Sequence, residues 1–262
     1  MSPPPGGYPG LGKQTSPVAT IVPKADKPEQ SQMPSFPFAA VLFDCDGVLV
    51  DSEPITNRVL AEMLGELGWH LTTEESMNTF TGKAVKDETA LIESKTGVRI
   101  TEEWLKAFRG RRNEALERDL KAIPHAPAAI REIHAKLEGR IACASGADRH
   151  KVELQLAKVG LLDCFEGRIF SGHEMPRSKP HPDVYLAAAA ALGVDPKRCA
   201  VVEDTVTGAM AGVAAGATVF GYSTGESGHS GPEALRSVGA LQVFSDMKEL
   251  PALLAAHGLQ PA

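Results

Sequence analysis

The chain has only four cysteines in 262 residues, and they lie far apart without a CxxC pair. Most of their neighbours are apolar. Free cysteine is among the most buried residue types, and disulfide-dense secreted domains use far more of it. We therefore expect a cytoplasmic protein with reduced core thiols at Cys45, Cys143, Cys164 and Cys199.

The chain also lacks a net positive charge and has few aromatic side chains. The formal net charge is -6, the sequence pI is near 5.8, and aromatic residues make up 5% of the chain. A polyanion would find no basic field here, so nucleic acid is not an expected partner. Apolar runs stay well short of the ~20 residues that span a bilayer, so we expect no membrane partner either. A monomer is the default expectation.

The first 37 residues are rich in proline and glycine and contain neither an arginine nor the apolar core of a signal peptide. Such a segment cannot bury enough apolar surface to offset the entropy lost on ordering. We predict a disordered tail over residues 1–37 and assign it no function. An alternative is a true start at Met33.

Short apolar runs that end in polar residues recur after the tail and predict strands buried on both faces. They cover residues 39–43, 140–144, 199–202, 217–221 and 242–244. Helical patterns lie between or after them, over 151–159, 182–192, 207–215 and 232–238. This alternation predicts an α/β fold with a doubly wound, Rossmann-like parallel sheet.

One interval breaks the alternation. From about Glu53 to His125 only helix-like segments occur, at 57–67, 74–79, 87–95 and 102–120. A loop of this length would be unusual in a compact domain. We predict a helical cap domain at 54–125, inserted into a core formed by 38–53 and 126–262. Because the insertion leaves the carboxyl end of the first strand, where open α/β sheets bind ligands, we expect the cap to close over the active site.

Paired acidic residues end two of the predicted strands. Asp44 and Asp46 lie two apart, so strand alternation directs both carboxylates to one side of the sheet. Glu203 and Asp204 end another run, where Thr205 can cap the following helix in their place. Like charges brought together need a metal or substrate to compensate them, and hard cations such as Mg²⁺ prefer oxygen ligands.

Two further segments provide candidates for binding an anion. Ser145 ends a third strand, and with the backbone amides of Gly146 and Ala147 it can form a phosphate cradle, although a serine there can simply be a helix cap. Lys179 lies in a segment stiffened by Pro180 and Pro182, so its ammonium should be held in place rather than solvated.

These motifs, in this order, resemble the haloacid dehalogenase superfamily. Residues 43–53, from Phe43 to Glu53, resemble its first motif in the branch similar to β-phosphoglucomutase and small sugar-phosphate phosphatases. Ser145 matches the second motif, Lys179 the third, and Glu203 with Asp204 the fourth. The resemblance covers nearly everything after Pro37.

The resemblance implies a phosphoryl-transfer enzyme with Asp44 as nucleophile and Asp46 as general acid and base. Asp44, the backbone carbonyl of Asp46, and Asp204 would hold Mg²⁺, with Glu203 as a ligand or a supporting partner. Ser145 and Lys179 would bind the phosphoryl oxygens. The second acid at Asp46 favours phosphoryl transfer over dehalogenation.

The mutase-like members carry a histidine where this chain has Thr56, and an arginine in a cap loop that here contains Lys83 and Lys86. We therefore predict a Mg²⁺-dependent phosphatase for a small phosphorylated metabolite, with a phosphosugar mutase and a catalytically silent binding protein as alternatives. Lys83 or Lys86 would contact an anionic part of the substrate, or else lie on a solvated surface.

The segment from Phe170 to Gly172, with the stretch from Arg177 to Pro180, resembles bacterial phosphatases that act on 6-phosphogluconate. A test of that substrate follows from this likeness. Four polar residues near the predicted active end receive no role: Arg149, His173, His181 and His229.

Overall fold

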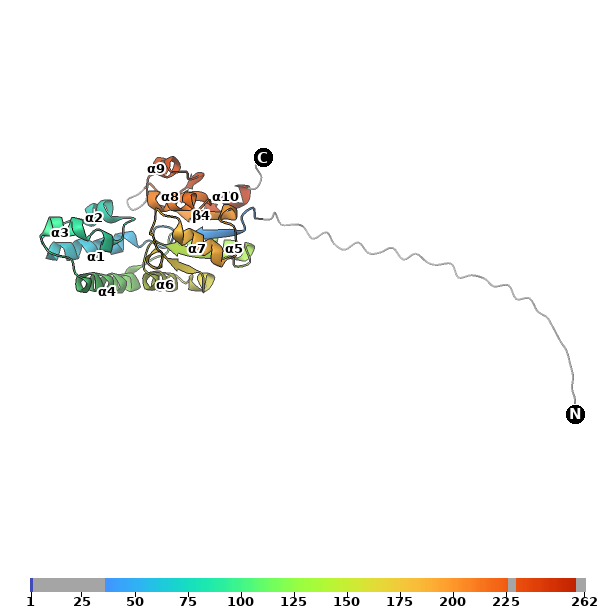
Figure 1. The fold of residues 1–262 in the computed structure, drawn as a ribbon, viewed down its shortest axis with the longest axis horizontal. Helices are drawn as coiled ribbons and strands as arrows, with labels where there is room; N and C mark the ends of the chain where they lie inside the picture. The colour runs from blue at the N-terminus through green and yellow to red at the C-terminus, as the bar shows by residue number, and fades with distance from the viewer. Residues whose placement is uncertain (2–35, 226–229, 258–262) are drawn as a thin grey trace. The chain divides into compact units, whose positions relative to one another are not determined.

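The computed structural model describes Met1, residues 36–225 and residues 230–257 (Figure 1). Within these residues one parallel sheet has the strand order β3-β2-β1-β4-β5-β6. The strands are β1 (Ala40–Phe43), β2 (Ile141–Ser145), β3 (Ile169–Ser171), β4 (Cys199–Glu203), β5 (Thr218–Tyr222) and β6 (Gln242–Phe244). The α/β class and the doubly wound parallel sheet are confirmed. The predicted tail, apart from Met1, Phe36 and Pro37, lies outside the described residues.

The central strand β1 pairs with β2 on one side and with β4 on the other. All three strands are buried along their whole length, which explains why their sequences are continuously apolar rather than alternating. The strand order reverses at β1. In open α/β sheets the carboxyl ends of the strands flanking such a switch point form the ligand crevice.

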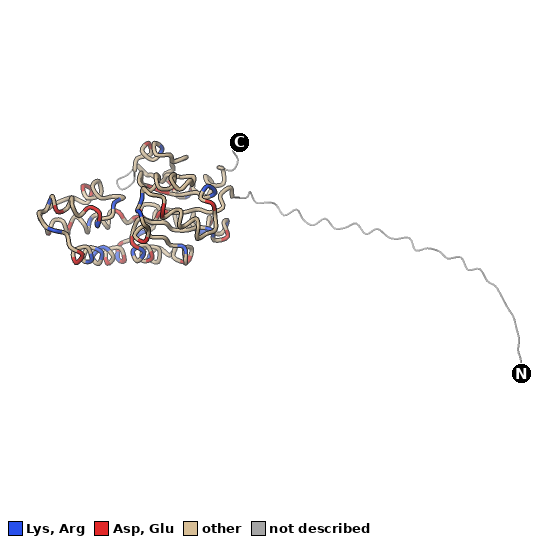
Figure 2. Tube along the Cα trace, in the orientation of Figure 1, with Lys and Arg blue, Asp and Glu red and all other residues tan. Residues whose placement is uncertain are grey.

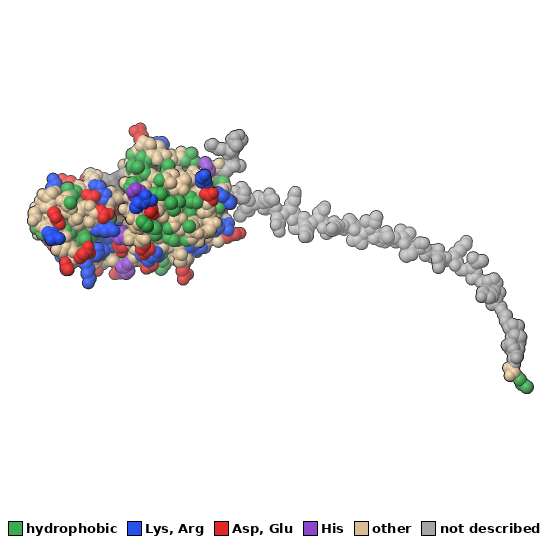
Figure 3. All heavy atoms as spheres, in the orientation of Figure 1, with side chains coloured by type: hydrophobic (Ala, Val, Ile, Leu, Met, Phe, Trp, Pro, Cys, Tyr) green, Lys and Arg blue, Asp and Glu red, His purple; other side chains and the backbone are tan. Residues whose placement is uncertain are grey.

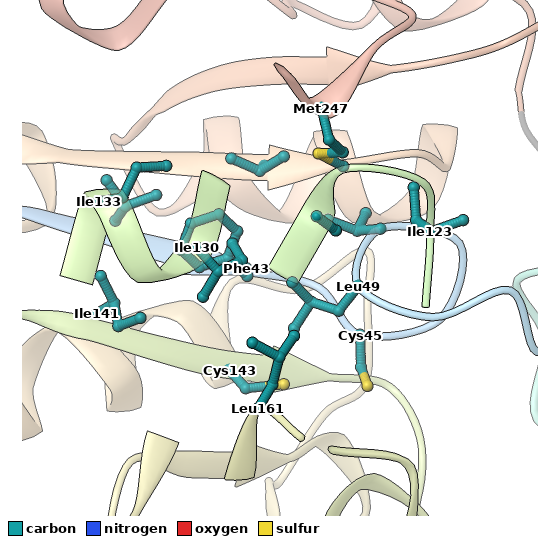
Figure 4. Close-up of a cluster of buried hydrophobic side chains, with 14 of the residues drawn as sticks. Phe43, Cys45, Leu49, Ile123, Ile130, Ile133, Ile141, Cys143, Leu161 and Met247 are labelled. Atoms are coloured by element: carbon teal, nitrogen blue, oxygen red, sulfur yellow. The ribbon is translucent and has the colours of Figure 1, made fainter. Parts of the chain in front are cut away.

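Helices cover both faces of the sheet and form two hydrophobic clusters with it. They are α5 (Ala126–Lys136), α6 (Arg149–Lys158), α7 (Asp183–Ala191), α8 (Val206–Ala214), α9 (Pro232–Ser237) and α10 (Leu250–Ala256). Figure 4 shows Phe43 of β1 among Ile130, Ile133 and Leu49 in one cluster. Tyr185 and Val201 belong to the cluster on the other face.

Between β1 and α5 the chain forms the helices α1 (Glu53–Glu66), α2 (Thr73–Phe80), α3 (Thr89–Thr96) and α4 (Glu102–Asp119), with a short turn η1 (Val85–Asp87). We call residues 53–119 the helical insertion. It has its own cluster of buried residues, including Leu64, Ile92 and Phe108. Acidic and basic residues are interspersed along it (Figure 2). Its assignment as a cap domain stays a prediction.

The sequence interpretation missed β3, α5 and α10. β3 has three residues and a partly exposed centre, so it offers no pattern to detect. Pro127 and Pro251 lie in the first turns of α5 and α10 and interrupt the helical patterns. A proline in the first turn is tolerated because the N–H that it lacks has no partner within the helix.

The four cysteines are free and buried, as predicted.

Among the described helices, none has the length and apolar character needed to cross a membrane. On the face drawn in Figure 3, acidic and basic side chains are mixed over the helical insertion.

Gly212 sets the distance between α8 and the sheet. A Cβ built there would lie 2.8 Å from Val219 Cγ2 and 3.0 Å from Val201 Cγ1. Gly212→Val should therefore lower the free energy of unfolding by about 1–3 kcal/mol through overpacking. The control is Gly110→Ala at an exposed position of α4, where a Cβ meets nothing within 4 Å. It should stabilise the protein by ~0.5–1 kcal/mol. Urea denaturation measures both, and equal effects would contradict the close packing.

Candidate active site

Three carboxylates meet where β1 and β4 end. Asp44 follows β1 and donates its backbone N–H to the carbonyl of Val202 in β4, at 3.0 Å. Asp44, Glu203 and Asp204 are buried, and each offers an oxygen within 4.8 Å of the others. The adjacency of β1 and β4 thus brings together residues that lie about 160 positions apart in the sequence.

Lys179 lies against this group and balances part of its charge. Its Nζ lies 2.6 Å from Asp44 Oδ1 and 2.6 Å from Glu203 Oε1, and the side chain is 10% exposed. Burial disfavours the ammonium, but the two carboxylates hold the pKa of Lys179 well above its usual value. Tyr185, which the sequence interpretation missed, donates its hydroxyl to Glu203 Oε1 at 2.9 Å.

Glu203 is fixed by the turn that leads into α8. Its Oε2 accepts hydrogen bonds from the backbone N–H groups of Asp204 and Thr205, at 3.0 and 3.1 Å, and from the Thr205 hydroxyl at 3.0 Å. Thr205 caps α8 through Gly208 N–H, as the sequence suggested. A Cβ at Gly208 would lie 1.7 Å from Glu203 Oε1, so this turn requires glycine.

Asp204 lacks the partners that Glu203 has. It is 1% exposed, and its Oδ1 has no hydrogen-bond partner within the described residues. Burial, together with the charges of Glu203 and Asp44, raises its pKa well above the usual value. Burial likewise raises the pKa of Asp44 to about 7, with Lys179 opposing the shift and Glu203 adding to it. Three carboxylates therefore share one lysine, so the group has fewer positive charges than ionisable carboxylates.

Asp46 does not join the three carboxylates through its side chain. Its Oδ1 accepts hydrogen bonds from Ser52 and from Gln155 Nε2, the latter at 2.8 Å, and lies 2.8 Å from Lys151 Nζ. Burial opposes ionisation, but Lys151, Ser52 and Gln155 lower the pKa of Asp46 to about 2. The sequence interpretation missed Lys151 and Gln155, although their i, i+4 spacing after the Ser145 strand placed them on one face of α6.

Ser145 ends β2 and is buried. Its Oγ accepts the backbone N–H of Ala147 at 3.0 Å, and Ser171 donates its hydroxyl to the Ala147 carbonyl at 2.6 Å. Ser171 of the neighbouring strand β3 thus holds the turn that follows Ser145. It continues into α6, which Asp148 caps through Lys151 N–H at 3.0 Å.

A cavity of about 330 Å³ joins these groups to the helical insertion. From the core it is lined by Asp44, Asp46, Ser145, Gly146, Lys179 and Glu203. Asp204 does not line it. Lys83 and Lys86 both line it and both are exposed, but Lys83 pairs with Glu88 at 3.7 Å.

Three of the residues without a predicted role have a defined place. His173 lines the cavity, and burial and then the charge of Lys86 lower its pKa. Arg149 pairs with exposed Glu174 at 2.6 Å, and His181 does not line the cavity. His229 lies outside the described residues. Thr56, where the mutase-like histidine would stand, lines the cavity, and its buried hydroxyl has no partner among the described residues.

The model of the haloacid dehalogenase-like hydrolase family matches residues 38–216. A 6-phosphogluconate phosphatase of Escherichia coli (strain K12) is 31% identical over 220 residues, which is 84% of this chain and 96% of that protein. Hexitol phosphatase B of the same strain is 31% identical over 192 residues, covering 67% of this chain and 79% of its own.

Solved structures show the same architecture. A hydrolase of the haloacid dehalogenase family from Deinococcus radiodurans R1, with bound phosphate and sodium, is 38% identical at a TM-score of 0.69. The match covers 87% of this chain and 100% of that one. A haloacid dehalogenase-like protein from Agrobacterium tumefaciens is 35% identical at a TM-score of 0.71, covering 84% and 99% of the two chains.

Without added metal, the free energy of unfolding should fall as pH rises from about 4 to about 7. The pKa of Asp44 rises from 3.8 to about 7 in the folded protein, and that of Glu53 from 4.5 to about 7. The folded state therefore binds more protons than the unfolded chain in this interval, and it loses stability as they leave. Denaturant titrations across this range measure the slope.

Asp44→Asn should flatten this slope, because the amide does not titrate. The control is Asp163→Asn, which alters an exposed carboxylate paired with Arg131 and should leave the slope unchanged. An unchanged slope in Asp44→Asn would contradict the assignment of the titration to this carboxylate.

Proposed function

The chain belongs to the haloacid dehalogenase-like hydrolase family, and we propose that it is a Mg²⁺-dependent phosphatase that hydrolyses a small phosphorylated metabolite through an aspartyl-phosphate. The observation that carries the proposal is the group formed by Asp44, Glu203 and Asp204 around Lys179 at the ends of β1 and β4. It combines a nucleophile, a cation for phosphate oxygens and oxygen ligands for a metal.

The donor set fits a divalent cation. Ionised together, the three carboxylates against one lysine would leave two negative charges for a cation to compensate, and Asp204 Oδ1 is buried without a hydrogen-bond partner within the described residues. Asp44 and Asp204, with the backbone carbonyl of Asp46, would hold Mg²⁺. Glu203 is already engaged by Lys179, Tyr185 and Thr205, which favours a supporting role. Bound Mg²⁺ supplies charge that neutralises phosphoryl oxygens.

In the first half-reaction, a carboxylate oxygen of Asp44 attacks the phosphorus and forms an aspartyl-phosphate, while the ester P–O bond breaks. The leaving alcohol oxygen takes a proton from Asp46. Lys179, Ser145 and the Gly146 amide bind the phosphoryl oxygens and stabilise their charge in the transition state. Lys179 is suited to this role because it is buried, fixed by two carboxylates and lines the cavity.

In the second half-reaction, water attacks the phosphorus, its proton passes to Asp46, and the bond from phosphorus to Asp44 breaks. With a pKa of about 2, Asp46 is a carboxylate in this structure and is ready to accept that proton. To act as the acid of the first step it must take up a proton from solvent when substrate binds, and the nearby phosphate dianion favours this by raising its pKa.

Water is the proposed acceptor because this chain differs from the mutase-like members at the two positions where they carry a histidine and a cap-loop arginine. Position 56 is threonine rather than histidine, and the turn around η1 offers lysines rather than an arginine. The 6-phosphogluconate and hexitol phosphatases that resemble the chain support hydrolysis of a polyhydroxylated phosphate ester. A cavity of about 330 Å³ suits a ligand of this size.

Phosphate release from a panel of sugar, sugar-acid and polyol phosphates with Mg²⁺ tests the proposal. Asp44→Asn should reduce turnover of the best substrate by at least ~10³-fold, since the amide cannot form the intermediate. EDTA should abolish it, and added Mg²⁺ should restore it. Asp163→Asn is the control at an exposed site.

Turnover that survives in Asp44→Asn or in EDTA would refute this mechanism. Release from no compound, even a sugar 1-phosphate supplied with a bisphosphate primer, would favour a catalytically silent binding protein.

We further propose that Lys86 contacts a carboxylate of the substrate, because it lines the cavity beside His173 without the ion pair that engages Lys83. Lys86→Ala should raise KM for 6-phosphogluconate about 10-fold and KM for glucose 6-phosphate less than about twofold. Lys83→Ala is the matched control. Steady-state kinetics with both substrates measure the difference, and an equal rise for the two would contradict the contact.

A further inference from the structure

Three buried polar side chains converge on a single oxygen, Asp46 Oδ1. Lys151 Nζ and Gln155 Nε2 each lie 2.8 Å from it, and the Ser52 hydroxyl donates to it as well. Lys151 is 5% exposed, while Gln155 and Ser52 are fully buried. A buried ammonium is costly unless it is paired, so this geometry holds the ion pair firmly.

Two of these donors, Gln155 and Lys151, are themselves held by further hydrogen bonds. Gln155 Oε1 accepts a hydrogen bond from Cys45 Sγ at 3.5 Å, which orients the amide so that its Nε2 faces Asp46. Lys151 lies in the first turn of α6, where its N–H is bound by Asp148 Oδ1. The other oxygen of Asp148 accepts from Arg112 of the helical insertion at 3.0 Å. The backbone of Lys151 is therefore held by Asp148 of the core, which is in turn held by Arg112 of the helical insertion.

The two oxygens of the Asp46 carboxylate are unequal as a result. Oδ1 receives all three contacts, and no hydrogen bond to Oδ2 occurs within the described residues. The side chain keeps 15% exposure and lines the cavity. Oδ2 is thus the oxygen that can meet a leaving group or a water molecule.

We propose that Lys151, aided by Gln155, is a positioning residue that fixes Asp46 by Oδ1 and leaves Oδ2 to exchange the proton with the leaving group and with water. The inference rests on the proposed phosphatase reaction. The residue added to the proposed reaction is Lys151 of the core helix α6. Its ammonium contacts the Asp46 side chain rather than Asp44 or Asp204.

Substrates with different leaving groups distinguish a positioning role of Lys151 from a purely structural one. Release of an alkoxide needs a proton from Asp46, whereas release of p-nitrophenolate does not. In Lys151→Met, pre-steady-state release of the alcohol from a sugar phosphate should therefore slow about 100-fold, and the p-nitrophenol burst by less than about threefold. The substrate dissociation constants, read from the concentration dependence of the burst rates, should stay within about twofold for both substrates. Slow hydrolysis of the aspartyl-phosphate should follow the p-nitrophenol burst.

Lys158→Met is the matched control, because it removes an exposed lysine from the same helix. It should leave both bursts unchanged. Thermal unfolding of each variant checks the fold, and Gln155→Leu gives a second variant in which the lysine is kept. We expect the same leaving-group dependence in Gln155→Leu, about 10-fold in size.

A double-mutant cycle measures whether Lys151 acts through Asp46. If Lys151 acts through Asp46, Lys151→Met should cause no further loss in an Asp46→Asn background. Equal slowing of both bursts, additive losses in the cycle, or wild-type rates in Lys151→Met would overturn the role of Lys151 while the phosphatase stands. Absence of turnover in the wild-type protein would instead overturn the proposed reaction, and this inference with it.

Discussion

The carboxylates of Asp44, Glu203 and Asp204 are buried together at the ends of β1 and β4, and their mutual repulsion constrains the chain around them. Lys179 is held between Asp44 and Glu203, and Tyr185 and Thr205 bind the remaining lone pairs of Glu203. Close approach of the backbone requires glycine at position 208. Much of the local sequence is explained by the need to hold these charges in a buried position.

The proposed chemistry divides between two separately supported acids. Burial raises the pKa of Asp44 to about 7, with Lys179 opposing the shift and Glu203 adding to it. Asp46, two residues on, faces Lys151 and Gln155, and its pKa falls to about 2. Two neighbouring carboxylates with opposite shifts are suited to different tasks, one as metal-assisted nucleophile and one as proton carrier.

Beyond Glu53, the helical insertion carries none of the four motifs, yet it contributes to the same cavity. Arg112 reaches across to Asp148, which caps α6 and thereby fixes the turn that follows Ser145. Lys86 lies near His173 of the core. Contacts of this kind link the shape of the insertion to the arrangement of the reacting groups, which is how one core can serve different substrates.

The sequence by itself determined the sheet and the main acids. Strands buried on both faces must be continuously apolar, so β1, β2 and β4 were recognisable, and the polar residues at their ends marked the edge of the sheet where the carboxylates meet. Asp44, Ser145 and Asp204 were found in this way.

Only the tertiary structure decided which groups face each other. Lys151 and Gln155 resemble ordinary residues of an amphipathic helix, and their contact with Asp46 depends on how α6 packs, more than 100 positions away in the sequence. The pairing of Arg112 with Asp148 likewise depends on the path of four helices. A local pattern records which residues are buried, but the partner of a buried charge is set by packing between distant segments.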